Sequence, residues 1–296
     1  MILSTSTNIG AFLPGGGFNP VTYTITECAA AGYTVLDMNF CEAMNPHSRM
    51  HEENWRDYIR ELSQCAAQQG VVFRQSHLPY YDVFGDPDPE HRAWMEEMIR
   101  RSIEGSALLG VRWCVTHPAT RWGGGRAECL AANLRYYTPL IQFAESFGFG
   151  IALENDFGEK NGQRFYCAEI GELVELVDAF HSPAVGICYD FGHAHLCGGS
   201  HTEKLLQIGS RLKAVHVQDN DGKTDGHRMP GEGNDDWQDA MRGLALIDYQ
   251  GELTYEIQNE GRSLTNEQKP AMIRRSFAVG QKLLDIYDQI KALKES

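Results

Sequence analysis

The stretch Val185-Gly-Ile-Cys-Tyr-Asp190-Phe-Gly-His193 contains the pattern that recurs along the chain and decides the fold. Its first five residues form a largely apolar run, which is typical of a strand buried on both faces of a parallel sheet. The run ends at a carboxylate, Asp190, and a histidine follows three residues later. Side chains capable of acid–base or metal chemistry therefore come directly after a buried strand.

Similar apolar runs recur along the whole chain, with amphipathic segments between them. The predicted strands are Leu3–Ile9, Thr34–Asn39, Val71–Ser76, Trp113–Thr116, Gly150–Glu154, Val185–Tyr189, Ala214–Val217 and Leu253–Ile257. The predicted helices include Asn54–Gln69, Glu90–Leu109, Glu128–Phe147, Ala168–Phe180 and Gln268–Lys291. Eight units in 296 residues predict an α/β fold of the (β/α)₈ TIM barrel type, whose usual length is about 250 residues. An open, doubly wound sheet with fewer strands is the alternative.

Composition limits the function classes. No Pro/Ser linker or composition break divides the chain, so we expect one domain over residues 1–296. There are 26 basic and 40 acidic side chains, a net charge of −14. This acidity disfavours a partner held mainly by its phosphates, although a local basic patch could still serve one. No Lys or Arg precedes Arg49, and no apolar run is long enough for a bilayer. We therefore expect a cytoplasmic protein without a membrane partner.

Metal-competent side chains fall at or near the ends of six of the predicted strands. These residues are His77, His117, Glu154, Asp190, His216 and Glu256, at spacings of 40, 37, 36, 26 and 40 residues. In a barrel the carboxyl ends of the strands converge on one face, where active sites of this fold are built. A mixture of carboxylates and imidazoles suits Zn²⁺, Mn²⁺, Co²⁺ or Mg²⁺. The spacing therefore predicts one metal site rather than six unrelated polar residues.

Further candidates lie close to these six. His193 follows Asp190 by three residues, and Asp225 and His227 form a D-x-H pair in the long loop after His216. Arg228 is either an exposed loop cation or a group that holds substrate. We interpret His195 as a surface residue or one that acts behind the ligands. Trp237 is expected to pack its loop onto the barrel.

Five motifs occur in order along nearly the whole chain. They are Ala152-Leu-Glu-Asn155, Cys188-Tyr-Asp-Phe-Gly-His193, Val215-His-Val-Gln-Asp-Asn220, Asp225-Gly-His-Arg-Met-Pro-Gly-Glu-Gly233 with Asp236-Trp237, and Thr254-Tyr-Glu-Ile257. In these motifs the sequence resembles the metal-dependent sugar isomerase/epimerase and endonuclease IV superfamily, with its xylose-isomerase-like barrel (AP endonuclease family 2). Such a resemblance indicates the superfamily more strongly than any one activity, because fold does not fix function.

The epimerase branch of this superfamily implies one divalent metal, held here by Glu154, Asp190, His216 and Glu256. The resemblance also implies that Glu154 and Glu256 exchange the proton, through a metal-stabilised enediolate, and that His193 and Arg228 hold the sugar. The substrate would be a sugar, a polyol or a sugar phosphate. Zn²⁺ or Mn²⁺ is the expected metal, with Mg²⁺ and Co²⁺ as alternatives. Relatives form dimers, which makes a homodimer an expectation here.

The endonuclease branch implies three zinc ions and phosphodiester hydrolysis. Its additional ligands correspond to His77, His117, His193, Asp225 and His227, so all of its nine positions carry the required residue types. The acidic charge and the Pro230–Trp237 segment, which looks more like epimerases and inosose-dehydratase-like members, favour sugar chemistry over nucleic acid. The sequence is also compatible with a related dehydratase and with a metal-binding barrel that lacks catalysis. It does not choose the sugar, the metal or the number of ions, between one and three.

Overall fold

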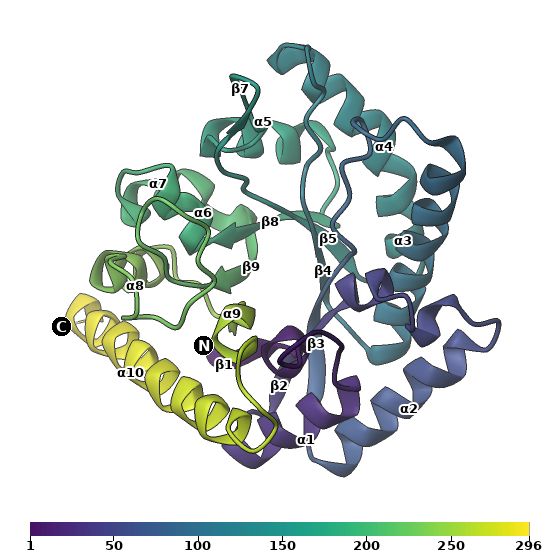
Figure 1. Cartoon of the computed structure of the whole chain (residues 1–296). Coiled ribbons are helices and arrows are strands. Elements are labelled where there is room, and N and C mark those ends of the chain that lie inside the picture. The colour runs from purple at the N-terminus through teal and green to yellow at the C-terminus, as the bar shows by residue number, and fades with distance from the viewer. Residues whose placement is uncertain (296) are drawn as a thin grey trace.

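The computed structural model describes residues 1–295 and contains a closed barrel of parallel strands surrounded by helices (Figure 1). The barrel strands are β1 (Ile2–Ser6), β2 (Val35–Asn39), β3 (Val72–His77), β4 (Trp113–Thr116), β5 (Gly150–Glu154), β8 (Val185–Asp190), β9 (Leu212–Val217) and β10 (Glu252–Tyr255). Their order around the barrel is β1-β10-β9-β8-β5-β4-β3-β2. The pairing of β1 with β10, which joins Ile2 to Glu252, closes the sheet. The predicted (β/α)₈ barrel is confirmed, and the open-sheet alternative is wrong.

The helices form the outer ring of the molecule (Figure 1). The α-helices are α1 (Val21–Ala31), α2 (Trp55–Gln68), α3 (Pro89–Leu109), α4 (Arg126–Ser146), α5 (Ile170–Ala179), α6 (Phe191–Leu196), α7 (His201–Ile208), α8 (Trp237–Leu246), α9 (Gln258–Gly261) and α10 (Lys269–Glu295). Short 3₁₀ helices are η1 (Thr7–Gly10), η2 (Phe40–Met44), η3 (Arg49–His51) and η4 (Gly209–Arg211), and β6 (Glu159–Lys160) pairs with β7 (Gln163–Arg164) as a hairpin. Because α10 packs against both α1 and α8, the last helix completes the ring.

The barrel interior determines where the strand ends point. Side chains alternate between the two faces of a strand, so residues two apart share a face. The small interior side chains Val115, Ala152, Cys188 and Ala214 pack together from four adjacent strands. The residue two positions after each of these is His117, Glu154, Asp190 or His216, which therefore faces the same interior at the carboxyl end. The pleat thus directs the predicted ligands toward a common axis.

Several predicted boundaries differ from the structure. The first strand ends at Ser6 rather than Ile9, because Ser6 caps η1 by accepting a hydrogen bond from the backbone N–H of Asn8. The last strand ends at Tyr255, so Glu256 lies just beyond it. Sequence patterns did not reveal α1, α6, α7, α8, α9 or the β6–β7 hairpin. Most of the missed helices have ten or fewer residues, which gives periodicity little length in which to appear.

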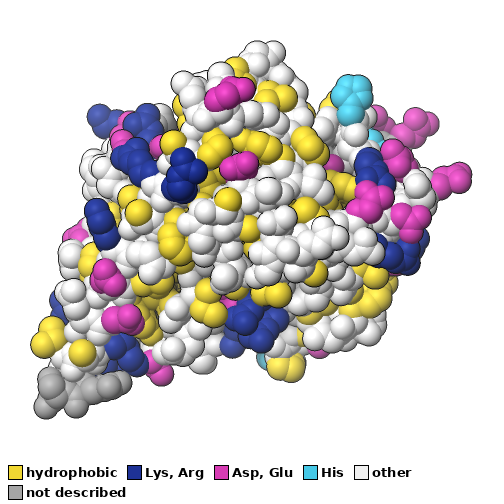
Figure 2. Space-filling model, turned by 90° about the horizontal axis from the view of Figure 1, so that it is seen from below, with side chains coloured by type: hydrophobic (Ala, Val, Ile, Leu, Met, Phe, Trp, Pro, Cys, Tyr) yellow, Lys and Arg dark blue, Asp and Glu magenta, His cyan; other side chains and the backbone are white. Residues whose placement is uncertain are grey.

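The surface is mixed in charge. On the face shown in Figure 2, Lys and Arg side chains lie in separate groups, with acidic and apolar side chains among them. Within residues 1–295, no helix combines the length and apolar character needed to cross a membrane.

Candidate metal centre

Four of the predicted metal ligands meet at the carboxyl-terminal mouth of the barrel. Glu154 ends β5, Asp190 ends β8, His216 lies in β9 and Glu256 follows β10. One potential ligand atom from each residue lies within 4.8 Å of those from the other three. We call these four residues the central cluster. The structure therefore brings together the whole set that the epimerase-like motifs indicated.

Burial makes the charges of the central cluster costly. Glu154, Asp190 and His216 are fully buried, and Glu256 is 8% exposed. Two of the carboxylate oxygens, Glu154 Oε2 and Asp190 Oδ2, are buried and accept no hydrogen bond from any described residue. An ionised carboxylate in such surroundings is normally compensated by an opposite charge. These oxygens without a hydrogen bond, together with the mixed Glu, Asp and His donors, fit a divalent cation.

Neighbouring side chains fix the orientation of Asp190. Its Oδ1 accepts hydrogen bonds from the backbone N–H of His193 (2.6 Å) and from Gln218 Nε2 (3.3 Å). The first of these bonds caps α6, so the start of that helix holds the carboxylate. Asn155 links the strand ends, because its side chain bonds both the N–H and the C=O of Asp190. The other oxygen, Oδ2, has no partner among the described residues, and it is the one available to a cation.

Gln75 contacts the His216 ring on the side away from the central cluster. Gln75 lies on β3, two residues before His77, and its Nε2 lies 3.0 Å from His216 Nε2. The other ring nitrogen, His216 Nδ1, donates to Glu154 Oε1 at 3.0 Å. Thr254, on β10, in turn donates to Gln75 Oε1 (3.4 Å). These contacts keep Nδ1 of His216 aimed at the central cluster.

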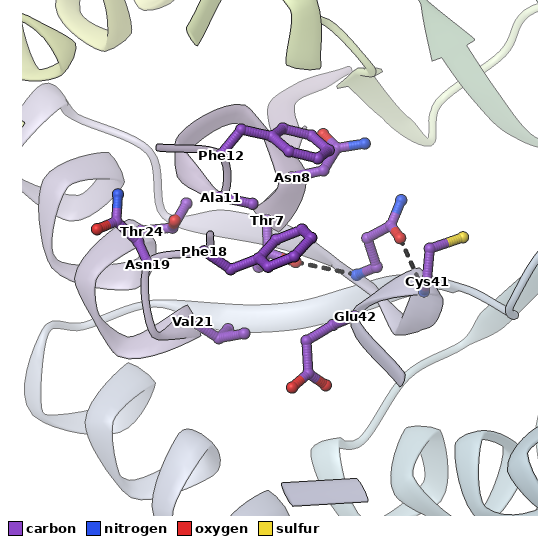
Figure 3. Close-up of a pocket in the computed structure, with 11 residues that line it drawn as sticks. Thr7, Asn8, Ala11, Phe12, Phe18, Asn19, Val21, Thr24, Cys41 and Glu42 are labelled. Carbon is purple, nitrogen blue, oxygen red and sulfur yellow. Dashed lines mark hydrogen bonds between the residues drawn. The ribbon is translucent and has the colours of Figure 1, made fainter. Parts of the chain in front are cut away.

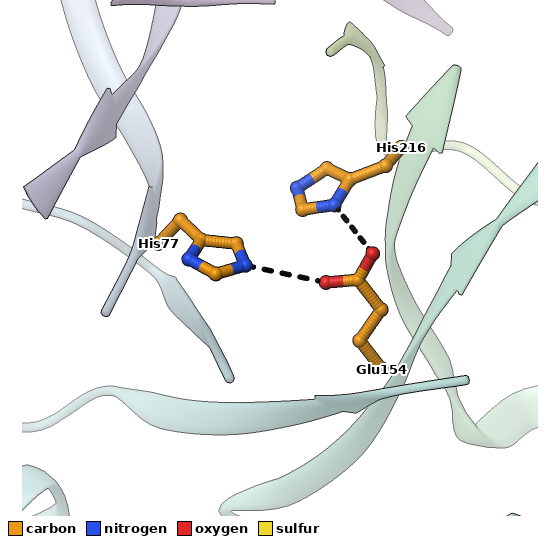
Figure 4. Close-up of side chains that lie close together, drawn as sticks. All are labelled: His77, Glu154 and His216. Carbon is orange, nitrogen blue, oxygen red and sulfur yellow. Dashed lines mark hydrogen bonds and ion pairs between the residues drawn. The ribbon is translucent and has the colours of Figure 1, made fainter. Parts of the chain in front are cut away.

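His77 and His117 lie beside Glu154, as the endonuclease-like motifs predicted. The Nε2 atoms of both histidines lie 3.4 Å from Glu154 Oε2. Figure 4 shows the Glu154 carboxylate between the rings of His77 and His216. One carboxylate thus faces imidazole nitrogens on two sides, which is an arrangement that can bridge two cations.

A further group of predicted ligands lies on the other side of the mouth. His227 Nε2 is 2.8 Å from Asp225 Oδ2, and His193 Nε2 is 3.8 Å from Asp225 Oδ1. Potential ligand atoms of these three residues lie within 4.8 Å of one another. The loop after β9 therefore carries Asp225 and His227 back to the end of β8.

Three histidines present the same nitrogen to the site. The Nδ1–H groups of His77, His193 and His227 donate to the backbone carbonyls of Leu78 (2.5 Å), Asn155 (3.0 Å) and Glu256 (2.9 Å). These bonds leave Nε2 of each ring facing a carboxylate. Metal-binding histidines commonly have their other ring nitrogen anchored in this way. The pattern favours cation binding over a set of unrelated buried histidines.

The pKa values show how the charges balance when no cation is bound. Burial acts to raise the pKa of Glu154, but the charges of His216 and His117 outweigh it and hold that pKa well below its usual range. Burial acts to lower the pKa of His216, yet Glu154 and Glu256 raise it to about 9. Burial raises the pKa of Asp190 to about 7 and lowers that of His117 to about 4. Protons on histidine thus provide positive charge that a bound metal ion would replace.

A pocket of about 420 Å³ opens above these groups. Glu256, Asp225 and four of the histidines line it, and Tyr80, Phe157 and Phe165 contribute aromatic walls. The Phe157 ring stacks on that of His193, with their centroids 4.7 Å apart. Sequence patterns did not identify these aromatic residues, because they lie in loops after β3 and β5, where no motif marks them. Asp156 also lines the pocket. The only sequence feature that could have identified it is its position two residues after Glu154, because residues two apart along a strand face the same side.

A smaller cavity of about 70 Å³ lies beside the main pocket, and Cys41 lines both (Figure 3). The rings of Phe12 and Phe18 form one wall, with centroids 5.5 Å apart. Asn8, another of its lining residues, donates to Glu256 Oε1 at 3.4 Å. The residues after β1 and β2 therefore reach the edge of the central cluster.

Three other predicted residues lie as follows. Arg228 is exposed and pairs with Asp219 through its backbone, and it does not line the pocket, so its substrate-binding role stays a prediction. Trp237 is buried against Phe191 and donates from Nε1 to Asp219 Oδ2 (3.0 Å), which confirms that it packs the loop onto the barrel. His195 is partly exposed and points away from the central cluster, toward Asn234 and Asp235.

Comparison with known proteins gives the following similarities. The family model for the xylose isomerase-like TIM barrel matches residues 25–283. A probable endonuclease 4 of Acholeplasma laidlawii is 29% identical over 174 residues, or 54% of this chain and 58% of that protein. Fructoselysine 3-epimerase of Shigella flexneri is 29% identical over 198 residues, or 64% of this chain and 67% of that protein. A crystal structure of a D-tagatose 3-epimerase-like protein superposes with a TM-score of 0.75 at 23% identity, covering 98% of this chain and 99% of that one, which shows the shared fold.

Proposed function

The chain belongs to the xylose isomerase-like TIM barrel family, and we propose that it is a divalent-metal-dependent isomerase or epimerase of a small carbohydrate. In this proposal Glu154, Asp190, His216 and Glu256 bind the metal. Glu154 and Glu256 also transfer the proton, and His193 with Arg228 orients the substrate. The cytoplasmic location and the homodimer stay predictions of the sequence.

The observation that carries the proposal is the pair of carboxylates in the central cluster. Glu154 and Glu256 come from strands β5 and β10, which β8 and β9 separate, yet their potential ligand atoms lie within 4.8 Å of each other. A substrate C–H held at the cluster would therefore lie close to both carboxylates. Removal of the proton by one carboxylate and its return by the other changes the configuration at that carbon.

A divalent metal at the central cluster supplies positive charge that acidifies the C–H beside a substrate carbonyl. The protein supplies the remaining parts. Glu256 lines the pocket and receives a hydrogen bond from Asn8, so it is oriented before substrate arrives. Glu154 lies fully buried below it, in contact with His216. Phe157 and Tyr80 contribute apolar surface that excludes water from the reacting carbon.

The charge of the pocket favours an unphosphorylated sugar or polyol. The pocket is lined by the carboxylates of Asp156, Glu159, Asp225 and Glu256, and its lining includes no Lys or Arg among the described residues. Phosphate recognition normally uses Arg, Lys or free backbone N–H groups. This lining supports a neutral substrate over a sugar phosphate. The relatedness to fructoselysine 3-epimerase agrees with carbohydrate chemistry.

One observation favours a second function, endonuclease IV-like phosphodiester hydrolysis. His77, His193 and His227 each aim Nε2 at a carboxylate, so the mouth offers three sets of potential ligands, two of which share Glu154 and His216. Clustered divalent ions activate water and neutralise a phosphodiester. The similarity to a probable endonuclease 4 fits this alternative. The acidic lining of the pocket argues against it, because DNA binding depends on basic groups.

Incubation of the Mn²⁺- or Zn²⁺-loaded protein with three substrate sets tests the proposal. The sets are unphosphorylated ketoses and aldoses, their phosphate esters, and duplex DNA containing an abasic site. We expect an epimer or isomer of an unphosphorylated sugar, and none from the Glu154→Gln variant. Cleavage of the DNA without conversion of any sugar would instead establish the second function. A dehydrated product would identify the related dehydratase.

A further inference from the structure

A second group of metal-competent residues lies outside the barrel mouth. His195 is on α6, His201 begins α7, and Asp235 lies just before α8. One potential ligand atom from each lies within 4.8 Å of the other two. These three residues, called the outer cluster, line a surface pocket of about 450 Å³ together with Asp236 and Asp239. They share no residue with the central cluster or with the pocket above it.

Asp235 has an unpartnered oxygen although its side chain is only 1% exposed. Its Oδ1 lies 2.7 Å from His201 Nε2 and accepts from the backbone N–H of Asp236 (2.8 Å). Its Oδ2 is buried without a hydrogen-bond partner among the described residues. A buried, unsatisfied carboxylate oxygen is costly. The same feature marks the central cluster, where Glu154 and Asp190 each have one such oxygen.

The tautomer of His195 gives an independent indication of a cation. Its Nε2 is 2.7 Å from Asn234 Oδ1, an acceptor, so Nε2 carries the hydrogen. In the neutral ring Nδ1 then has a lone pair, and it lies 3.3 Å from Asp235 Oδ1. Two lone pairs facing each other repel unless a ring proton or a metal ion lies between them. With the ring neutral, a metal ion bound to Nδ1 and to the carboxylate would supply that charge.

His201 is held in a similar way. Its Nδ1 lies 2.8 Å from the hydroxyl of Tyr189, which is buried on β8, and its Nε2 faces Asp235. When Nδ1–H donates to that hydroxyl, Nε2 becomes a metal ligand. Each histidine of the outer cluster thus has one ring nitrogen hydrogen-bonded to a neighbour and the other facing the Asp235 carboxylate. Histidines that bind metal ions commonly have their second ring nitrogen hydrogen-bonded in this way.

We propose that the outer cluster binds an additional metal ion, a Zn²⁺ with a structural role, through His195 Nδ1, His201 Nε2 and the Asp235 carboxylate. Zinc with bonds near 2.0–2.1 Å to nitrogen and oxygen places tetrahedral ligand atoms about 3.3 Å apart. The separation of His195 Nδ1 from Asp235 Oδ1, 3.3 Å, matches that value. His201 Nε2 and Asp235 Oδ1 are 2.7 Å apart, a hydrogen-bond distance, and would move apart by about 0.6 Å to hold the ion. The surface pocket leaves room for water to complete the coordination.

The ion would join two segments that also build the barrel mouth. His193 and His195 lie on the same short helix, and the loop after β9 carries Asp225 and His227 to one side and Asp235 to the other. A metal between His195, His201 and Asp235 ties this loop to α6 and α7. Its effect is therefore to fix the loop. Zinc binding at the outer cluster does not depend on which reaction the central cluster performs.

Zinc titration of the metal-free, full-length protein tests the proposal, with competition against a chromophoric chelator. His195→Ala and Asp235→Asn are compared with the wild type, and His47→Ala, which removes an exposed histidine far from both clusters in sequence, is the control. We expect one tightly bound zinc fewer per chain in both variants and no change in the control. Substitution by Co²⁺ should give a visible absorption band that His195→Ala lacks.

Equal zinc numbers and affinities in the wild type and His195→Ala would overturn the proposal. In that case the three residues are joined only by hydrogen bonds. His195→Ala would then lower the melting temperature of the metal-free protein without changing zinc binding. Because the His195 side chain is 22% exposed, its removal leaves no large cavity, and this variant decides the matter if Asp235→Asn does not fold.

Discussion

The central and outer clusters use similar residues in different settings. The residues of the central cluster lie at the ends of β5, β8, β9 and β10 and are almost completely buried. Those of the outer cluster lie on two short helices and a loop, beside an open surface pocket. Strand register holds the first set rigidly in a dry interior, where charges strongly perturb each other. This difference fits the proton chemistry proposed for the central cluster and the structural ion proposed for the outer cluster.

The largest effect should follow from removing one carboxylate of the central cluster. We expect Glu256→Gln to lower turnover by about 10²- to 10⁴-fold, the usual contribution of a positioned acid or base. Glu252→Gln is the matched control, because Glu252 lies at the other end of the same strand, 3.2 Å from Arg74. Steady-state kinetics on both variants would measure the difference. Equal losses would mean that the two ends of β10 do not differ in chemistry.

Asp37 lies in the barrel interior below the central cluster. Its ionisation reports whether that interior excludes water, as the comparison of the two clusters assumes. Asp37 is fully buried on β2, and burial raises its pKa to about 6. The folded protein therefore holds this proton more tightly than the unfolded chain does, whose pKa is 3.8. The resulting stability is present below about pH 4 and is lost as the pH rises through about 6. A shift of this size corresponds to at most about 3 kcal/mol.

Asp37→Asn, which imitates the protonated acid, should accordingly stabilise the metal-free protein at pH 8 and have little effect near pH 4. Urea unfolding at the two pH values measures the change. A stability gain of the same size at both pH values would show that the gain does not come from removing the buried charge of Asp37, and would contradict the prediction.

Gln75 should have a smaller effect, confined to metal binding. A metal on His216 Nδ1 requires the ring hydrogen on Nε2, so the Gln75 carboxamide must turn until its oxygen accepts that hydrogen. We expect Gln75→Leu to weaken metal binding at the central cluster by about 10- to 100-fold, as for other groups that orient ligands. Competition with a chelator measures this, and Gln69→Leu, at an exposed position, is the control. Unchanged affinity would contradict the role of Gln75.

The sequence predicts the central cluster well because strand ends converge in a barrel. Glu154 and Asp190 follow apolar runs directly, so their common location follows from the spacing alone. Gln75 was missed, although it lies two residues before His77 within a predicted strand, and the period of two was its signal. It could have been found by listing, for each predicted ligand, the residue two positions earlier in the same strand, which also faces the barrel interior.

The outer cluster and the pocket walls could not be predicted in the same way. The direction of His201 depends on the turn before α7, where Gly198 and Gly199 adopt φ angles of 70° and 85° that favour glycine. Tyr80 and Phe157 belong to loops whose paths are set by tertiary packing. Asp235 meets His195 only because a long loop returns along the barrel. Such contacts depend on loop geometry, which residue patterns do not encode.

Solvent-deuterium incorporation tests the central claim most directly. The metal-loaded protein is incubated in D₂O with the unphosphorylated sugar that it converts, and the position of deuterium in the product is read by NMR. We predict one deuterium at the carbon whose configuration or oxidation state changes, and no incorporation with Glu154→Gln or Glu256→Gln. Product formed without deuterium, or incorporation that survives both substitutions, would contradict proton transfer by the two carboxylates of the central cluster.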